Sequence, residues 1–205
     1  MSDFFTAIAH LDPVAMLRAG GYIGLALVVF AESGLLVGIF LPGDSLLFAA
    51  GLLSSNGLFS IIPLILIVVV AAILGDSFGY WFGTKAGENL FNRKDSLFFK
   101  QEYLERTERF YQEYGGRAII LARFVPIVRT IAPVLAGVGS MKYRTFLSRN
   151  VIGGLAWGAG MTLLGFSLGS IIPDSEKYVL PLSLVIIVIS FFPIILNLIR
   201  NKRTV

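Results

Sequence analysis

The sequence contains no cysteine and a single histidine, and these two scarcities exclude several kinds of site. Without cysteine there is no disulfide framework, no thiol nucleophile and no thiolate metal site. The one histidine, His10, lies near the N-terminus and cannot build a metal site by itself, so no role is assigned to it. Acids and arginines occur without a serine–histidine pairing. We therefore expect no metal, no cofactor and no enzymatic activity.

Charged residues are also scarce, because they make up 15% of the 205 residues, whereas soluble domains carry about 25%. Hydrophobic residues make up 56%. Three apolar runs, 58–80, 151–172 and 178–199, approach or exceed the roughly 20 residues that a helix needs to cross a bilayer. The net charge of +4 does not indicate nucleic-acid binding, since the basic residues flank apolar segments. The sequence predicts an all-α polytopic membrane protein with about three full crossings.

Two further apolar stretches, 20–53 and 118–141, are interrupted by proline and by ionisable residues. The resulting pieces are too short to span a bilayer, so each stretch predicts a re-entrant helical hairpin. Non-helical backbone at membrane depth is tolerated only against protein or a water-filled cavity, which places both hairpins inside the protein. The residues expected at the hairpin turns are Pro42, Gly43, Pro126 and Pro133.

The distribution of lysine and arginine predicts opposite orientations for the two halves. Residues 85–117, the patch 142–149 and the C-terminal tail are rich in basic residues and are therefore expected in the cytoplasm. The two hairpins then open to opposite sides and meet near the midplane, as in an inverted-topology repeat. Within one membrane domain of residues 1–205, the expected segments are an interfacial 1–18, a first repeat 20–84, a cytoplasmic amphipathic 85–117, a second repeat 118–172 and a transmembrane helix 178–199. A solvated loop helix is the plainer explanation of the charges in 85–117, and the side on which Met1 lies stays open.

Four ionisable residues lie in the two hairpins: Glu32 and Asp44 in the first, Arg123 and Arg129 in the second. Left unpaired at the bilayer centre, they would cost about 3 kcal/mol each. The acids and arginines should therefore face one another or a wet cavity. One interpretation is a purely structural ion-pair cluster. The favoured one is a site in which the two arginines bind phosphate oxygens with their planar forks, and the two acids exchange protons.

Three other polar or aromatic residues are secondary candidates. Asp76 could join the site or lie at the membrane interface, and Asn150 could line the cavity or anchor at the interface. For Trp157 the interface anchor is favoured. Small-residue spacings predict close helix contacts; they are Gly75-Gly79-Gly83, Gly154-Gly158 and Gly165-Gly169.

Several motifs occur together around these charges. Glu32 precedes the run 41–45 (Leu-Pro-Gly-Asp-Ser), Gly116-Arg117 precedes 122–130 (Ala-Arg-Phe-Val-Pro-Ile-Val-Arg-Thr), and the pattern continues from Pro133 to Trp157. In this combination, over about residues 15–175, the sequence resembles the DedA family of membrane proteins. The resemblance implies kinship with VTT-domain lipid scramblases, a place in the bacterial inner membrane and a role in envelope integrity and proton-motive-force maintenance. It also implies that the family's essential acids and arginines correspond to Glu32, Asp44, Arg123 and Arg129.

The resulting prediction is a proton-motive-force-linked translocation, by flipping or recycling, of a lipid phosphate across the bacterial inner membrane. Undecaprenyl phosphate or a phospholipid is the expected cargo, so the expected partners are membrane lipids and protons, without nucleic acid. The alternative is a proton-coupled transporter of a small solute or ion. The C-terminus is expected in the cytoplasm. The lipid, the direction, the proton stoichiometry and assembly with further copies of the chain stay open.

Overall fold

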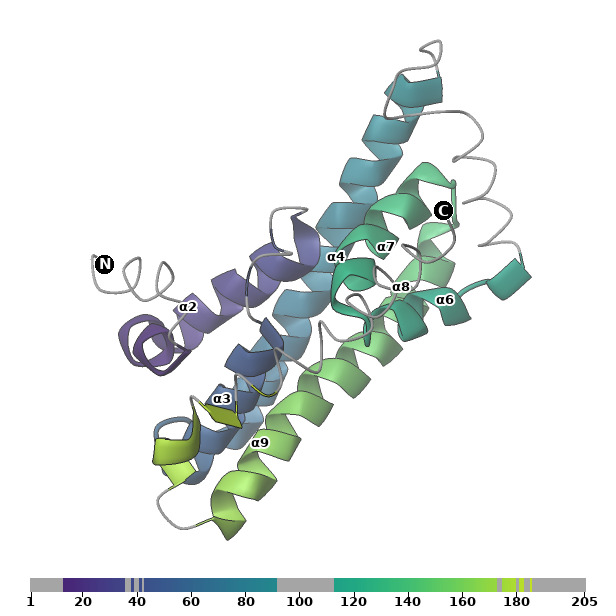
Figure 1. Cartoon of the computed structure of the whole chain (residues 1–205). Helices are drawn as coiled ribbons and strands as arrows, with labels where there is room; N and C mark the ends of the chain where they lie inside the picture. Colours follow the sequence, from purple (N-terminus) through teal and green to yellow (C-terminus); the bar gives the residue numbers. More distant parts are fainter. Residues whose placement is uncertain are drawn as a thin grey trace, which may run out of the picture. The chain divides into compact units, whose positions relative to one another are not determined.

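The computed structural model describes residues 13–35, 38, 41, 43–91, 113–172, 175–179, 181–182 and 185 (Figure 1). Every regular element in this part of the chain is a helix, which confirms the all-α class. In chain order the elements are α2 (Pro13–Gly34), α3 (Gly43–Ser55), α4 (Ile61–Phe91), α6 (Arg117–Ala122), α7 (Pro126–Val138), α8 (Tyr143–Gly154), a π-helical turn (Leu155–Ala159), α9 (Gly160–Ile171) and a 3₁₀ turn (Ser175–Tyr178).

Three helical stretches are long and apolar enough to cross a membrane: Pro13–Gly34, Ile61–Ala86 and Tyr143–Ile171. The last one is continuous through α8, the π-helical turn and α9. The second and third overlap the crossings predicted at 58–80 and 151–172. Most of the predicted crossing 178–199 lies outside the described residues, as do residues 1–12 and 92–112 of the predicted interfacial and amphipathic segments.

The first span, α2, begins earlier than the hairpin predicted at residue 20. Pro13 is its first residue, where the fixed φ of proline suits a helix start and its missing N–H costs nothing. Gly21 interrupts the helix with φ 56° and ψ −148°, a backbone conformation in the left-handed range of φ that favours glycine. Most residues of the following turn, Pro42 among them, lie outside the described part, so the first hairpin stays a prediction.

The stretch predicted as the second hairpin contains two short helices with a break between them, and its re-entrant course stays a prediction. The helix α6 ends at Ala122, and α7 begins at Pro126, which follows the extended residue Val125. The two helices contact each other. Pro133 lies inside α7 and not at its end. Since proline has no N–H, the helical bond that residue 133 would donate to the Arg129 carbonyl is absent.

The chain forms two compact units, each assembled from separated segments. Unit 1 comprises 1–25, 42–65 and 161–205, and unit 2 comprises 26–41 and 66–160. In unit 1, α3 packs directly on α9: a Cβ atom at Gly51 would overlap the Thr162 carbonyl, and one at Gly165 would overlap the Phe48 carbonyl. These glycines allow the two backbones to touch.

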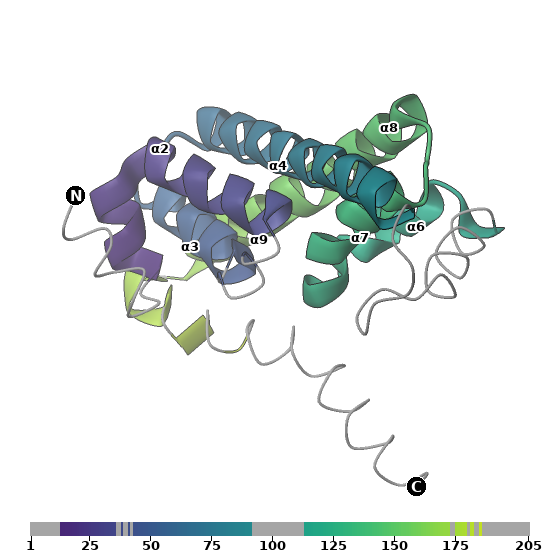
Figure 2. The same cartoon turned by 90° about the horizontal axis from the view of Figure 1, so that it is seen from above.

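In unit 2, α7 packs on α4 by the same means, and α6, α7 and α8 gather beside the C-terminal part of α4 (Figures 1 and 2). A Cβ atom at Gly83 would overlap the Val134 carbonyl, and one at Gly137 would overlap the Tyr80 carbonyl. The helices α3 and α7 have 13 residues each, and each packs on a helix from the other half of the sequence, α3 on α9 and α7 on α4. The predicted glycine contacts between the halves are confirmed at Gly83 and Gly165, whereas Gly75 contacts α2 of its own half. The inverted orientation stays a prediction.

Candidate functional site

One cluster of buried polar side chains lies within unit 2. Its members come from four helices, one break and one π-helical turn, and each is at most 5% exposed. A bilayer and a protein core both penalise buried charge, so each charge in this cluster needs a partner. The members are Glu32 of α2, Asp76 of α4, Arg123 of the α6–α7 break, Arg129 of α7, Asn150 of α8 and Trp157 of the π-helical turn.

The first ion pair joins Arg123 to Asp76. The Arg123 Nη2 group donates to Asp76 Oδ2 and, at 3.3 Å, to the carbonyl of Ala72 one turn earlier on α4. The arginine leaves the chain where α6 has just ended, so its side chain is free to reach across to the middle of α4. This pair fixes the break between α6 and α7 against α4, a helix long and apolar enough to cross a membrane.

Asn150 ties the same arginine to α8. Its side-chain oxygen accepts a hydrogen bond from Arg123 Nη2 at 2.5 Å, and its amide nitrogen donates to the Ile73 carbonyl at 3.1 Å. Gly153 and Gly154 lie beside the guanidinium, where a Cβ at Gly153 would come within 3.2 Å of Arg123 Cδ. The small residues leave room for the arginine on this face of α8. Asn150, a secondary candidate in the sequence, thus belongs to the cluster.

The second ion pair joins Arg129 to Glu32 across 97 positions of sequence. Arg129 lies in the first turns of α7, and Glu32 lies near the end of α2. The expectation that a buried acid of the first half pairs with an arginine of the second half is confirmed for these two residues. Thr130 and Ser33, their chain neighbours, are each 2% exposed or less.

Trp157 connects the two pairs. The Arg129 guanidinium carbon lies 4.6 Å from the centroid of the indole, and that of Arg123 lies 5.8 Å from it. Both distances permit a cation–π attraction, which is strongest for tryptophan. The side chain is 2% exposed, which contradicts the interface-anchor interpretation. Its place in a π-helical turn between α8 and α9 resembles the π-bulges that often mark functional sites.

Some donors in the cluster have no acceptor. Within the described residues, Arg123 Nε and Nη1 and the Ser33 hydroxyl are buried without a hydrogen-bond partner. A buried donor without an acceptor costs about 1–3 kcal/mol, and more when the donor is charged. The native cluster is therefore suited to an additional acceptor, either water or a bound anion.

Asp44, the fourth predicted charge, belongs to the other compact unit of the chain. It occupies the first turn of α3, is half-buried and belongs to unit 1, whereas the other three predicted charges belong to unit 2. Gly43 is the first residue of α3 and is buried. The acid that pairs with Arg123 is Asp76, which the sequence offered only as a secondary candidate. The sequence contained a signal for Asp76, because an acid within an apolar helix is costly unless it is paired.

No metal site accompanies these charges in the described part of the chain, where histidine, aspartate and glutamate form no group of three or more that could hold an ion. The polar chemistry available in the cluster is that of two guanidinium groups, two carboxylates and one amide, with the buried hydroxyls of Ser33 and Thr130 beside them. Such a set can bind an anion and can take up or release a proton.

Comparison with known proteins places the chain among bacterial membrane proteins. The VTT domain family matches residues 41–167. The protein DedA of Escherichia coli K12 is 46% identical over 204 residues, covering 96% of this chain and 92% of that protein. An uncharacterized membrane protein of Mycobacterium tuberculosis is 43% identical over 99% of this chain and 92% of its own. A third, from Mycobacterium leprae, is 41% identical over 78% of this chain and 75% of its own. No solved structure matches the chain. The chain therefore belongs to the DedA family of membrane proteins, which carries the VTT domain.

Proposed function

We propose that this protein moves a lipid phosphate across the bacterial inner membrane, with a polyprenyl phosphate such as undecaprenyl phosphate, or a phospholipid, as cargo. The observation that carries the proposal is the buried Arg123, whose Nε and Nη1 groups have no acceptor among the described residues. A second buried guanidinium, that of Arg129, lies against the same indole ring. Two arginine forks that share one buried site match the oxygens of a phosphate headgroup.

Charge balance suggests how the headgroup enters. The cluster holds two acids and two arginines, so it is neutral when all four are ionised. An anion that binds there must either displace an acid from its arginine or bring a proton with it, because uncompensated charge is costly in hydrocarbon. In our proposal the phosphate displaces Glu32 from Arg129, and Glu32 takes up a proton. Movement of the lipid is then coupled to movement of a proton.

The remaining acids have different places in the proposal. Asp76 stays with Arg123, because this pair is also held by Asn150 and the Ala72 carbonyl. Asp44 is assigned to proton exchange on the basis of the sequence and the family. The C-terminus is proposed to lie in the cytoplasm because of the distribution of basic residues. We propose transport without chemical conversion of the lipid.

A proton-coupled transporter of small solutes would use the same charges. The lipid is favoured because an apolar groove lies on the same unit, between α2 and α4, and could accommodate a hydrocarbon tail. Leaving the tail in an apolar environment avoids about 0.8 kcal/mol for each CH₂ that would otherwise meet water. Only the headgroup then needs a polar route.

The proposal is tested by reconstituting the purified protein in phosphatidylcholine vesicles that contain a polyprenyl phosphate or phosphatidic acid. Headgroup exposure on the outer leaflet is followed with and without a pH gradient. We expect the wild-type protein to redistribute the lipid phosphate, faster with the gradient, and we expect Arg129→Gln to abolish the redistribution. Glu32→Gln should remove the dependence on the gradient.

Arg144→Gln is the matched control, since Arg144 is exposed on α8 and loses the same charge outside the cluster. It should transport like the wild type. Uptake of a soluble anion without lipid redistribution would replace the proposal by the solute alternative. Equal redistribution by wild type and a stable Arg129→Gln variant would overturn the role of the cluster.

A further inference from the structure

Two exposed arginines of unit 2 lie close together on the contacting helices α6 and α8. Arg117 is the first residue of α6, and Arg149 lies in the middle of α8. A Cβ atom at Gly116 would overlap the Cγ atom of Arg149 and come within 2.9 Å of its Nε atom. The stem of Arg149 therefore lies across the glycine that directly precedes Arg117. We refer to these two residues as the exposed arginine pair.

The exposed arginine pair has no acidic partner. Within the described residues, neither Arg117 nor Arg149 forms an ion pair. The sequence contains no aspartate or glutamate between Glu113 and Asp174. Two cations that lie close together repel each other, and the repulsion is stronger beside hydrocarbon than in bulk water. The packing of Arg149 across Gly116 thus keeps positive charge in one place, and an anion bound there would relieve the repulsion.

The length of the third membrane span places Arg149 near the level of lipid phosphates. The span Tyr143–Ile171 has 29 residues, which is about 43 Å of helix. A bilayer with its headgroups is about 40–45 Å thick, of which about 30 Å is hydrocarbon, so each headgroup layer is about 5–7 Å deep. Arg149 lies six residues after Tyr143, about 9 Å from the end of the span. An arginine side chain at this boundary can reach the phosphates of the surrounding leaflet.

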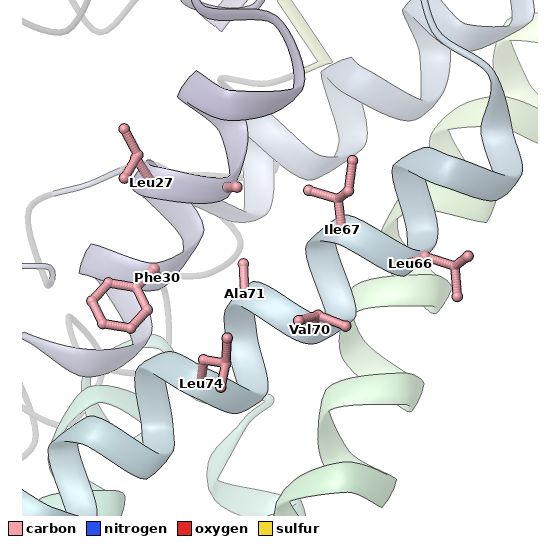
Figure 3. A pocket seen from close by; sticks show the side chains of 8 residues that line it. Leu27, Phe30, Leu66, Ile67, Val70, Ala71 and Leu74 are labelled. Atoms are coloured by element: carbon pink, nitrogen blue, oxygen red, sulfur yellow. The ribbon is translucent and has the colours of Figure 1, made fainter.

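The chemistry of the exposed arginine pair suits a net negative headgroup. The groove between α2 and α4 on the same unit is lined only by apolar side chains, so it offers a headgroup no donor (Figure 3). The arginine pair instead offers two planar guanidinium forks that match phosphate oxygens. A zwitterionic headgroup would bring a further cation to this place, whereas an anionic phospholipid brings only negative charge.

We propose that Arg117 and Arg149 bind the phosphate of an anionic phospholipid in the leaflet at the Tyr143 end of α8. The lipid supplies the negative charge that this part of the chain lacks. The site is separate from the buried cluster, because Arg123 is buried and lies six residues beyond Arg117, about 9 Å along α6. The inference goes beyond the proposed function, since a lipid bound at the interface need not be transported.

Arg144 provides a matched control on the same helix. The positive-inside rule accounts for basic residues at one end of a span, but it does not distinguish Arg144 from Arg149. Both are exposed on α8. They are five residues apart, so at about 100° per residue Arg144 points about 140° away from Arg149 around the helix. It also lies about 2 Å from the end of the span, further from the hydrocarbon.

The test uses a single fluorescent label, which is possible because the chain has no cysteine. Ile152→Cys carries a bimane group on a residue that is 48% exposed and lies one turn after Arg149. The labelled protein is reconstituted in phosphatidylcholine vesicles that contain either phosphatidic acid or phosphatidylcholine with a spin label on the acyl chain, at the same mole fraction. We expect spin-labelled phosphatidic acid to quench the bimane several-fold more strongly than spin-labelled phosphatidylcholine does.

In the same labelled background, we expect Arg149→Gln and Arg117→Gln each to bring the two lipids to nearly equal quenching, and Arg144→Gln to preserve the difference. Equal quenching without these substitutions would overturn the inference. An equal loss in Arg144→Gln and Arg149→Gln would also overturn it, because it would indicate attraction to general surface charge. Displacement of phosphatidic acid by millimolar inorganic phosphate at constant ionic strength would replace the lipid by a soluble anion. A lipid preference without any lipid movement in the transport assay would support this site while contradicting the proposed function.

Discussion

The two buried ion pairs of unit 2 use the same chemistry but are held in different ways. Arg123 donates to a carboxylate, an amide oxygen and a backbone carbonyl, so its pair with Asp76 is tied to both α4 and α8. Arg129 pairs with Glu32 of α2 and has the closer contact with the indole of Trp157, at 4.6 Å against 5.8 Å. The first pair joins the α6–α7 break to α4 and α8, and the second joins α7 to α2.

We infer that the two ion pairs have different roles. A buried pair whose geometry is fixed by several hydrogen bonds is expensive to separate, because removing one partner leaves a charge uncompensated. A pair supported by an aromatic face can exchange its carboxylate for another anion while the cation keeps its contact with the ring. We therefore expect Arg123–Asp76 to hold the structure and Arg129–Glu32 to respond to substrate.

The largest expected effect comes from Asp76→Asn. It leaves the Arg123 guanidinium without its counter-charge in a buried position, so stability should fall by about 3–5 kcal/mol. Unfolding in detergent by a denaturant titration measures this. The double variant Asp76→Asn with Arg123→Gln, which removes both charges, should regain much of the loss. An Asp76→Asn protein as stable as the wild type would contradict the structural role of the first pair.

Glu32→Gln tests the other side of the comparison. Arg129 keeps its cation–π contact with the indole of Trp157. The loss of stability should therefore be smaller than for Asp76→Asn in the same titration. Transport in vesicles should nevertheless lose its response to a pH gradient, because glutamine cannot carry the proton. A larger loss of stability than that of Asp76→Asn would reverse the assignment of the two pairs.

Asn150→Ala sharpens the comparison by weakening the network without removing charge. The Ile73 carbonyl loses a donor and the Arg123 Nη2 group loses an acceptor, which costs about 1–3 kcal/mol. Combined with Asp76→Asn, the loss should be less than the sum of the two single losses, since both residues bind the same Nη2 group. Strict additivity in this double-mutant cycle would indicate that the amide and the carboxylate act separately.

Trp157→Phe should have the smallest effect on stability, about 0.5–1 kcal/mol, because phenylalanine keeps a ring but attracts cations less than tryptophan does. Lipid-phosphate transport should slow more than stability falls, since the ring contacts both arginines. Trp81→Phe, at an exposed tryptophan of α4, is the matched control and should leave transport unchanged. Equal transport by the two variants would remove Trp157 from the site.

Part of the site could be predicted from the sequence because membrane energetics restrict where charge can lie. Glu32, Arg123 and Arg129 stand out in apolar stretches, and the cost of leaving them unpaired predicts that acids and arginines meet. The choice of acid for Arg123 could not be predicted in this way. Asp76 and Asp44 are both acids in apolar surroundings, and only the packing of α4 beside the α6–α7 break brings Asp76 to the arginine.

The buried position of Trp157 could not be predicted from the sequence, for a related reason. Tryptophan in a spanning helix most often anchors at the membrane interface, and the sequence favoured that interpretation. A π-helical turn from Leu155 to Ala159 changes which face of the helix each residue occupies, and a local departure of this kind leaves no reliable pattern in the sequence.

The sequence by itself determined the class of the protein, its apolar spans, the two interrupted stretches and the charges that need partners. Those properties follow from composition and hydropathy along the chain, which are local. Only the tertiary structure decided that Arg129 meets Glu32 across 97 positions, that Arg123 meets Asp76, and that one indole lies against both arginines. The reason is that these contacts depend on the rotation and crossing of helices, which close approach at glycines such as Gly34 and Gly75 sets in three dimensions.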